Sequence, residues 1–250
     1  MLCKRIVVAL DVKNGQVVKG VNFDNLSENG NPLELAVKYQ QNGADEIIFL
    51  DISACLEKRK TLLQLAEKVS EKLSIPFTVG GGVSSVSDAT ELFKNGADKV
   101  FINSAALNNP ELIKRLAMNC SSANIIVAVD SRLQNSEYKV YSSAGKKQTP
   151  YELAEWCLKA QELGAKELMI TSIDRDGTRK GFDLDMLGRL TDKISIPIII
   201  SGGAGSMNDF KKAFENGADA ALGAGVFHSN TFTPNTLKLF LKEEKINVRL

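Results

Sequence analysis

The sequence is nearly devoid of histidine, the residue that metal sites and nucleophilic triads most often share. Its 250 residues include one histidine, one tryptophan and six prolines. The lone His228 gives no support for a Ser-His-Asp system, and we interpret it as a packing or surface residue. No GxGxxG sequence, Walker loop or cluster of metal ligands occurs, so neither a cofactor nor a metal is predicted. Four scattered cysteines without a Cys-x-x-Cys pair favour reduced thiols in the cytoplasm over a zinc site: Cys3, Cys55, Cys120 and Cys157.

Excess charge and long apolar runs are also missing. The formal net charge is +1, so no global field attracts nucleic acid or an anionic membrane, and neither is predicted as a partner. No stretch approaches the ~18 apolar residues that cross a bilayer. The short apolar run at the N-terminus ends at Asp11 without a long apolar region or cleavage site, so a signal peptide is not expected. An anionic substrate must therefore be held by local groups in a cytoplasmic protein.

Short apolar runs alternate with amphipathic helical stretches along the whole chain. Eight such runs are rich in valine and isoleucine without strict alternation, as expected for parallel strands covered by helices. Helix candidates such as 32–43, 59–74 and 149–164 lie between them. This pattern predicts an α/β fold, a (β/α)₈ TIM barrel in which residues 1–250 form one domain. The runs span 5–11, 46–52, 76–82, 99–105, 125–130, 167–173, 197–203 and 219–225.

The two halves of the sequence resemble each other. The segment IPFTVGGG (75–82) corresponds to IPIIISGG (196–203), and NGADKV (95–100) corresponds to NGADAA (216–221). Both pairs, and GADEIIF with GAKELMI, are offset by 121 residues, while VALD and VAVD are offset by 119. Four segments in one order at nearly one offset indicate an internal duplication of a half-barrel.

Two aspartates end the first and fifth predicted strands. Asp11 and Asp130 occupy duplicated positions and should face each other across the barrel at the carboxyl ends of the strands, where active sites of this fold lie. A single aspartate at a strand end is more often a cap for the next turn, but a duplicated pair favours catalysis. Two opposed carboxylates suit general acid-base chemistry, with one protonated and one ionised.

Glycine-rich strand ends form two further pairs. Residues 80–82 and 103–105 follow the third and fourth strands, and residues 202–205 and 223–225 follow the seventh and eighth. Glycines let backbone N–H groups approach an anion, and the following helix adds its positive N-terminal dipole. The alternative is tight turns that need glycine. The duplication favours two phosphate sites on opposite sides, and hence a long ligand with a phosphate at each end.

Loops add further polar candidates. Residues 11–23 contain an Asn-Gly turn between two short β-like runs and predict a hairpin lid carrying Lys19, for which a solvated surface lysine is the alternative. Only the first strand is expected to be followed by such a hairpin, and only the sixth by a loop like 172–181. That loop carries Asp176 and Gly177. Further polar residues near strand ends are Thr171, Asn103 and Ser201.

Charged residues begin four of the strands: Arg5, Glu46, Lys99 and Glu167. Their alternating signs predict a ring of ion pairs across the amino-terminal opening of the barrel. Stability features gather on that face, so the residues by themselves favour a structural plug over a gate to a passage.

Together these motifs resemble the cyclase subunits of imidazole glycerol phosphate synthase, from histidine biosynthesis. The resemblance covers essentially the whole chain and includes RIVVALDVKNGQVVKGVNF, FLDISACLEKR, PFTVGGGV, GADKVFINSAA, ITSIDRDGT, SGGAG and the ending INVRL. It implies an enzyme that takes ammonia from a glutaminase partner and acts on a bisphosphorylated ribulosyl aminoimidazole carboxamide nucleotide (PRFAR). The implied products are imidazole glycerol phosphate and an aminoimidazole carboxamide ribotide (AICAR).

The resemblance also implies roles for particular residues. The catalytic aspartates correspond to Asp11 and Asp130, the loop lysine to Lys19, and the four strand-start charges to an ammonia gate, which favours a gate over a plug. A glutaminase would then dock on the amino-terminal face. The family's phosphate sites correspond to Gly82, Asn103 and Ser104 in one half, and to Gly177, Gly203, Ala224 and Gly225 in the other.

Departures from the family pattern leave the catalytic groups in place. Ala9 stands where a cysteine is common, Val21 where a threonine is common, and Gly225 where a serine is common. Backbone N–H groups survive the last change, so at most a hydroxyl contact is weakened.

Three alternatives remain open at this point. The sister phosphoribosylformimino isomerase shares the barrel, the aspartates and the phosphate sites but needs no ammonia. A paralogous ammonia-channelling barrel would keep the gate and act on another substrate. A non-catalytic phosphate-binding barrel would only activate a partner.

Overall fold

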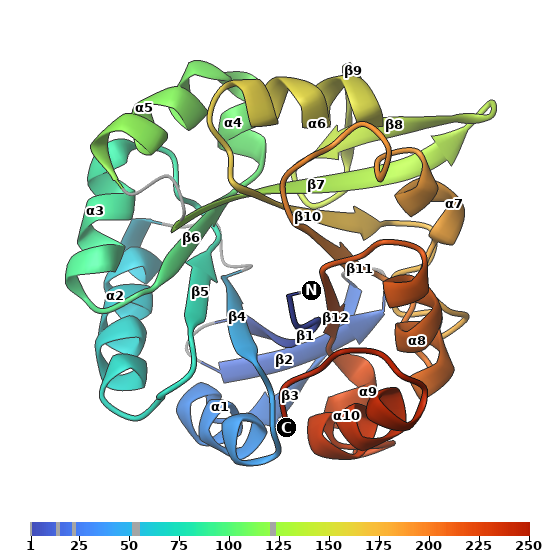
Figure 1. Cartoon of the computed structure of the whole chain (residues 1–250). Helices are drawn as coiled ribbons and strands as arrows, with labels where there is room; N and C mark the ends of the chain where they lie inside the picture. Colours follow the sequence, from blue (N-terminus) through green and yellow to red (C-terminus); the bar gives the residue numbers. More distant parts are fainter. Residues whose placement is uncertain (1, 14–15, 22–23, 52–55, 121–123) are drawn as a thin grey trace.

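The computed structural model describes residues 2–13, 16–21, 24–51, 56–120 and 124–250. Its centre is a closed ring of eight parallel strands surrounded by helices (Figure 1). The ring closes where the last strand pairs with the first, Arg5 lying opposite Ala220. The predicted (β/α)₈ barrel is therefore confirmed. In ring order the strands are β1 (Arg5–Lys13), β4 (Glu46–Asp51), β5 (Phe77–Gly80), β6 (Lys99–Ile102), β7 (Ile125–Gln134), β10 (Glu167–Ser172), β11 (Ile198–Ser201) and β12 (Ala220–Gly223).

Helices cover the outside of the barrel (Figure 1). The helix over Pro32–Gln41 shows how a start is capped: the Asn31 side chain accepts from the N–H groups of Leu33 and Glu34, and proline occupies the first helical turn. In the described ranges, no helix combines the length and apolar character needed to cross a membrane. The helices are α1 (Pro32–Gln41), α2 (Leu56–Ser70), α3 (Val86–Lys94), α4 (Ser104–Asn108), α5 (Glu111–Asn119), α6 (Leu153–Glu162), α7 (Leu184–Gly188), α8 (Met207–Glu215), α9 (Gly225–His228) and α10 (Pro234–Glu243).

Two antiparallel hairpins extend the barrel. In the first, β1 continues into β2 (Gln16–Val21), which is the hairpin predicted over 11–23, although the Asn-Gly turn at 14–15 lies outside the described residues. The strand β3 (Asp24–Gly30), which the sequence did not predict, then pairs with β2. The second adds β8 (Glu137–Ser142) and β9 (Lys147–Glu152) to β7. The expectation that only the first strand leads into a hairpin is therefore wrong.

The sequence did not predict the second hairpin, because its turn lacks the usual residues and part of its last strand was predicted to be helical. Ser143 and Ala144 adopt positive φ angles of 56° and 54°, so the chain reverses without an Asn-Gly or Asp-Gly pair. The helix predicted over 149–164 begins only at Leu153, because the side chain of Glu152 caps it by accepting from Ala154 and Glu155 N–H groups. Its first predicted residues belong to β9.

The duplication is visible in side-chain hydrogen bonds as well as in the amino-acid sequence. Asp88 completes a capping box with Ser85 at the start of α3, and Asp209 does the same with Ser206 at the start of α8, 121 residues later. Likewise Gln40 Oε1 accepts from Ser74 N, and Gln161 Oε1 accepts from Ser195 N. Equivalent side chains therefore hold equivalent turns in both half-barrels.

The interior of the barrel is lined by alternate residues of each strand. Ten buried apolar side chains form this inner cluster, separate from the larger cluster between strands and helices. On β6 the inner cluster contains Phe101, which lies between Lys99 at the amino end and Asn103 at the carboxyl end. A Cβ at Gly80 would overlap the Phe101 ring, so glycine is required there. The inward positions thus carry polar groups at both ends and apolar groups between them.

Candidate active site

The two candidate catalytic aspartates belong to opposite strands of the barrel. Asp11 lies on β1 and Asp130 on β7, and these strands are separated by three others in either direction around the ring. Each lies two residues beyond an inner-cluster alanine, Ala9 or Ala128, so both continue the inward-facing set. Each also pairs with the antiparallel strand that follows it along the chain: Asp11 pairs with Val18 of β2, and Asp130 pairs with Tyr141 of β8.

Both carboxylates have raised pKa values. Burial, and then the negative charge of Asp176, raises the pKa of Asp11 from 3.8 to about 7. Burial also raises the pKa of Asp130, to about 6, but a hydrogen bond from Asn103 opposes the rise. The two groups titrate near neutral pH, where general acid-base catalysis is most effective.

Asn103 contacts Asp130 directly. Its Nδ2 donates to Asp130 Oδ2 at 2.9 Å. Its Oδ1 is buried and has no hydrogen-bond partner among the described residues. Both the duplicated strand ends and the resemblance assigned Asn103 to a phosphate site, and the register between β6 and β7 that brings it to Asp130 is not apparent from the sequence.

Asp176 adds a third carboxylate. It lies in the loop after β10, and its charge raises the pKa values of both Asp11 and Asp130. Its own pKa is raised by burial, against a hydrogen bond from the Gly177 backbone. The loop therefore places Asp176 close to both aspartates. The sequence had predicted only that Asp176 lies on the loop after the sixth strand.

Two further polar residues complete one side of the site. Thr171 on β10 pairs in register with Asp130 on one side and with Ser201 of β11 on the other. Both side chains belong to largely buried residues. The predicted polar residues at these strand ends therefore form a continuous arc with Asp130.

The first predicted phosphate site lies after β5 and β6. Gly82 has a φ of +74°, in the left-handed region, and a Cβ there would meet nothing within 4 Å. Ser104 begins α4, and its Oγ accepts from the N–H of Ser143 at the tip of the second hairpin, at 2.9 Å. The hydroxyl hydrogen of Ser104 is therefore directed away from Ser143 and is available to another acceptor.

The second predicted phosphate site lies after β10, β11 and β12. Gly203 has a φ of +105°, and a Cβ there would overlap the carbonyl oxygen of Gly181, so the loop after β10 packs directly on this segment. Ala224 and Gly225 stand at the start of α9. Arg179, which the sequence reasoning did not select, donates from Nη2 to Gly225 O at 3.3 Å and brings a positive charge here.

For Lys19, the structure describes the backbone only. It lies in β2 opposite Ser27 of β3, but its side chain falls outside the described part of the structure. His228 accepts or donates a 2.6 Å hydrogen bond with the Tyr39 hydroxyl on α1, consistent with a packing role.

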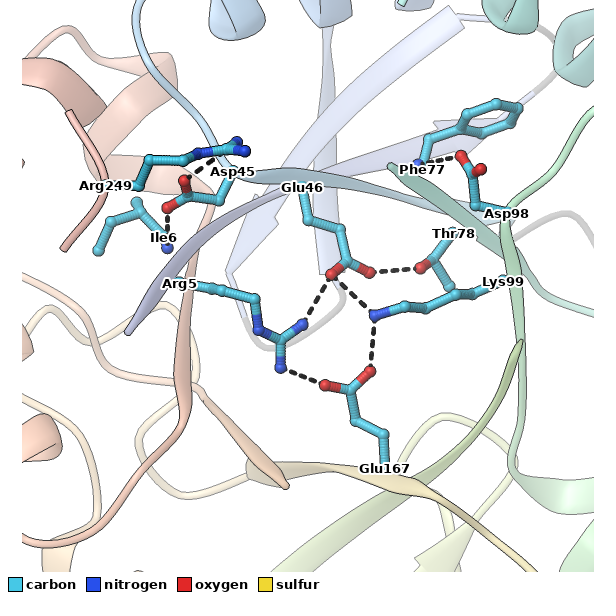
Figure 2. A network of polar contacts seen from close by, with 10 residues as sticks. All are labelled: Arg5, Ile6, Asp45, Glu46, Phe77, Thr78, Asp98, Lys99, Glu167 and Arg249. Carbon is cyan, nitrogen blue, oxygen red and sulfur yellow. Dashed lines mark hydrogen bonds and ion pairs between the residues drawn. The ribbon is translucent and has the colours of Figure 1, made fainter. Parts of the chain in front are cut away.

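The opposite end of the barrel carries a closed ring of charges (Figure 2). Arg5 contacts Glu46 at 2.9 Å and also contacts Glu167. Lys99 contacts the same two carboxylates at 3.0 and 2.8 Å. Burial lowers the pKa of Arg5, but the two glutamates outweigh this effect and leave the pKa above its ordinary value. The guanidinium therefore stays charged. The ion pairs expected from the alternating strand-start charges are therefore present.

Thr78 belongs to this ring and was missed from the sequence. Its Oγ1 donates to Glu46 Oε1 at 2.6 Å (Figure 2). Thr78 is fully buried and pairs in register with Lys99. The sequence does single out Thr78, because it is a polar residue at an inward position of a strand otherwise rich in apolar residues and glycine.

No group of three or more histidine, cysteine, aspartate or glutamate side chains suited to a metal ion occurs within the described ranges. The chemistry that the site offers is carried by carboxylates, amides, hydroxyls and backbone groups.

Comparisons with known proteins show the family to which the chain belongs. Residues 5–233 match the family model described as "Histidine biosynthesis protein". The chain is 51% identical to "Imidazole glycerol phosphate synthase subunit HisF" of Petrotoga mobilis, and 48% identical to the protein of that name from Pyrococcus furiosus, in each case over the whole of both chains. The protein of that name from Flavobacterium psychrophilum is 51% identical, again over both whole chains. The chain therefore belongs to the HisF family, the cyclase subunits of imidazole glycerol phosphate synthase.

Proposed function

We propose that this chain joins ammonia to PRFAR and releases imidazole glycerol phosphate and AICAR. The observation that carries the proposal is the pair of opposed aspartates at the carboxyl ends of β1 and β7, with pKa values of about 7 and about 6. Two such groups can be protonated and ionised at the same pH, which an acid and a base in one step require.

Asp130 acts as the general base and Asp11 as the general acid. Ammonia attacks the substrate carbonyl, and Asp130 takes a proton from the attacking nitrogen. Asp11 donates a proton to the oxygen that leaves as water or to the departing nitrogen when the C–N bond breaks and the imidazole closes. Thr171 adjoins Asp130 in the barrel, Ser201 adjoins Thr171 on the next strand, and both contact the substrate between the two carboxylates.

The two phosphates of PRFAR bind at the duplicated sites. Gly82 and Ser104 provide one, together with the backbone of Asn103, and four residues of the other half provide the second: Gly177, Gly203, Ala224 and Gly225. Left-handed glycines at both sites support this, because they allow backbone N–H groups to approach an anion closely. Lys19, on the first hairpin, closes over the substrate.

Ammonia arrives through the barrel from a glutaminase subunit bound at the amino-terminal face. The relatives are named as subunits, which supports an assembly. The ring of Arg5, Glu46, Lys99 and Glu167 is the gate, and it must open by breaking ion pairs. Beyond the charged residues, the Phe101 side chain fills the interior beside Gly80. Ammonia therefore passes only when the phenyl group of Phe101 is displaced.

The experiment supplies the purified chain with PRFAR and ammonium at alkaline pH and follows AICAR release by absorbance. We expect turnover that depends on ammonium. Lack of AICAR release at saturating ammonium would contradict the proposal and favour a non-catalytic phosphate-binding barrel. Conversion of the aminoaldose precursor of PRFAR without ammonium would favour the sister isomerase.

A further inference from the structure

The duplication leaves one clear difference beside the two aspartates. Asn103 directly follows β6, and Ala224, 121 residues later, directly follows β12. Their backbones are alike: φ and ψ are −133° and −93° at Asn103, and −124° and −72° at Ala224. Each precedes a short helix, and neither caps that helix with its side chain. The two half-barrels therefore present an amide and a methyl group from equivalent places.

Each of these residues adjoins one aspartate in the same register. Ile102 pairs with Val127 of β7, so Asn103 lies level with Ala128, two residues before Asp130. Gly223 pairs with Val8 of β1 in the same way, so Ala224 lies level with Ala9, two residues before Asp11. Asn103 uses this position to donate to Asp130 at 2.9 Å. The methyl group of Ala224 has no donor to offer Asp11.

The difference has a direct electrostatic consequence. Burial raises the pKa of both carboxyls, and the charge of Asp176, from the loop after β10, raises both further. These influences are shared. The hydrogen bond from Asn103 stabilises only the ionised form of Asp130 and lowers its pKa relative to Asp11.

The second polar atom of the Asn103 amide is left without a partner. Its Oδ1 is buried and has no partner among the described residues. A buried acceptor without a donor is unfavourable, so a donor on the bound reactants is expected to satisfy it. Ammonia is the N–H donor that must lie beside Asp130 when that group accepts its proton.

We propose that Asn103 is the positioning residue that makes the duplicated aspartates unequal, donating to Asp130 as the base and accepting from the incoming ammonia. The inference rests on the proposed function, since it needs ammonia as nucleophile and Asp130 as base. Ala224 is the reason that Asp11 remains the acid.

The first test measures the aspartates in the substrate-free protein, which needs no activity. Side-chain ¹³C NMR follows the titration of Asp11 and Asp130, assigned by the loss of a signal in Asp11→Asn and Asp130→Asn. Asn103→Ala, which copies the other half-barrel, should raise the midpoint of Asp130 from about 6 toward that of Asp11. Asn108→Ala, at the exposed end of α4, is the matched control and should leave it unchanged. An unchanged Asp130 midpoint in Asn103→Ala would overturn the proposal.

The reciprocal variant protects the test against misfolding. Ala224→Asn places an amide beside Asp11 and should lower the Asp11 midpoint. If Asn103→Ala does not fold, this result decides alone, and an Asp11 midpoint that stays or rises contradicts the proposal.

Kinetics separate positioning from phosphate binding. With PRFAR and ammonium, Asn103→Ala should lower kcat by about 10-fold or more and raise the KM for ammonia, with little change in the KM for PRFAR. An effect confined to the KM for PRFAR would make Asn103 a phosphate ligand only and overturn the inference. Full turnover by Asp130→Asn would instead refute the proposed function, and the NMR comparison would still report whether Asn103 controls Asp130.

Discussion

Replacing Asp11 by asparagine should stabilise the fold at alkaline pH. Burial, followed by repulsion from Asp176, raises the pKa of Asp11 from 3.8 to about 7. The folded-state pKa lies above the unfolded one, so the unfolded chain loses this proton first and the free energy of unfolding falls as pH rises between the two values. At 1.36 kcal/mol per pKa unit, the full cost above pH 7 is about 4 kcal/mol. Asparagine has nearly the same shape and cannot ionise.

Urea unfolding at pH 5 and pH 8.5 measures this cost. The advantage of Asp11→Asn over the parent protein should grow by about 2–3 kcal/mol between these two values, because most of the loss falls between pH 5 and pH 7. Asp192→Asn, at an exposed position, is the control for a generic change of charge. A variant whose advantage is the same at both pH values would refute the raised pKa of Asp11.

Three further predictions follow from the same contacts. At constant free ammonia, kcat/KM should rise as pH increases through about 6, where the base ionises, and fall above about 7, where the acid loses its proton; a flat profile between pH 5 and pH 8 would contradict both assignments. Thr78→Val removes the 2.6 Å hydrogen bond to Glu46 and should lower the free energy of unfolding by about 1–3 kcal/mol in urea, since a buried carboxylate oxygen loses its donor; an unchanged unfolding midpoint would show that the ring holds Glu46 without it. Lys238→Met leaves the buried carboxylate of Asp45 without its 2.6 Å partner and should cost about 3 kcal/mol by the same measurement, whereas a neutral effect would mean that nearby Arg249, 3.6 Å from Asp45, suffices.

The barrel itself could be predicted from the sequence because its signals repeat. Eight apolar runs separated by helical stretches, with four segments of the first half repeated in the second at nearly one offset, indicate both the strand number and the pairing order. The aspartates and the charged ring follow, because strand ends and strand starts of a parallel barrel gather at opposite faces. Each of these predictions needs only the position of a residue within its strand.

The parts that escaped prediction depend on contacts between strands or on turns without a signature. The second hairpin turns through positive φ angles at Ser143 and Ala144, residue types that seldom mark such turns. The bond from Asn103 to Asp130 depends on the register of β6 against β7, and a slip of one residue would turn the side chain away. The sequence predicted aspartates at equivalent positions in unequal surroundings, and the hydrogen bond from Asn103 shows one way in which those surroundings differ.

The most direct measurement is the ammonia-dependent turnover of PRFAR by Asp11→Asn and Asp130→Asn, with substrate binding measured in parallel. Each substitution removes one positioned proton-transfer group, which typically contributes ~10²–10⁴-fold to the rate. We therefore expect kcat to fall by at least about 100-fold in each variant, while PRFAR still binds at the two phosphate sites. Near-full turnover in either variant would contradict the claim that these opposed aspartates carry the catalysis.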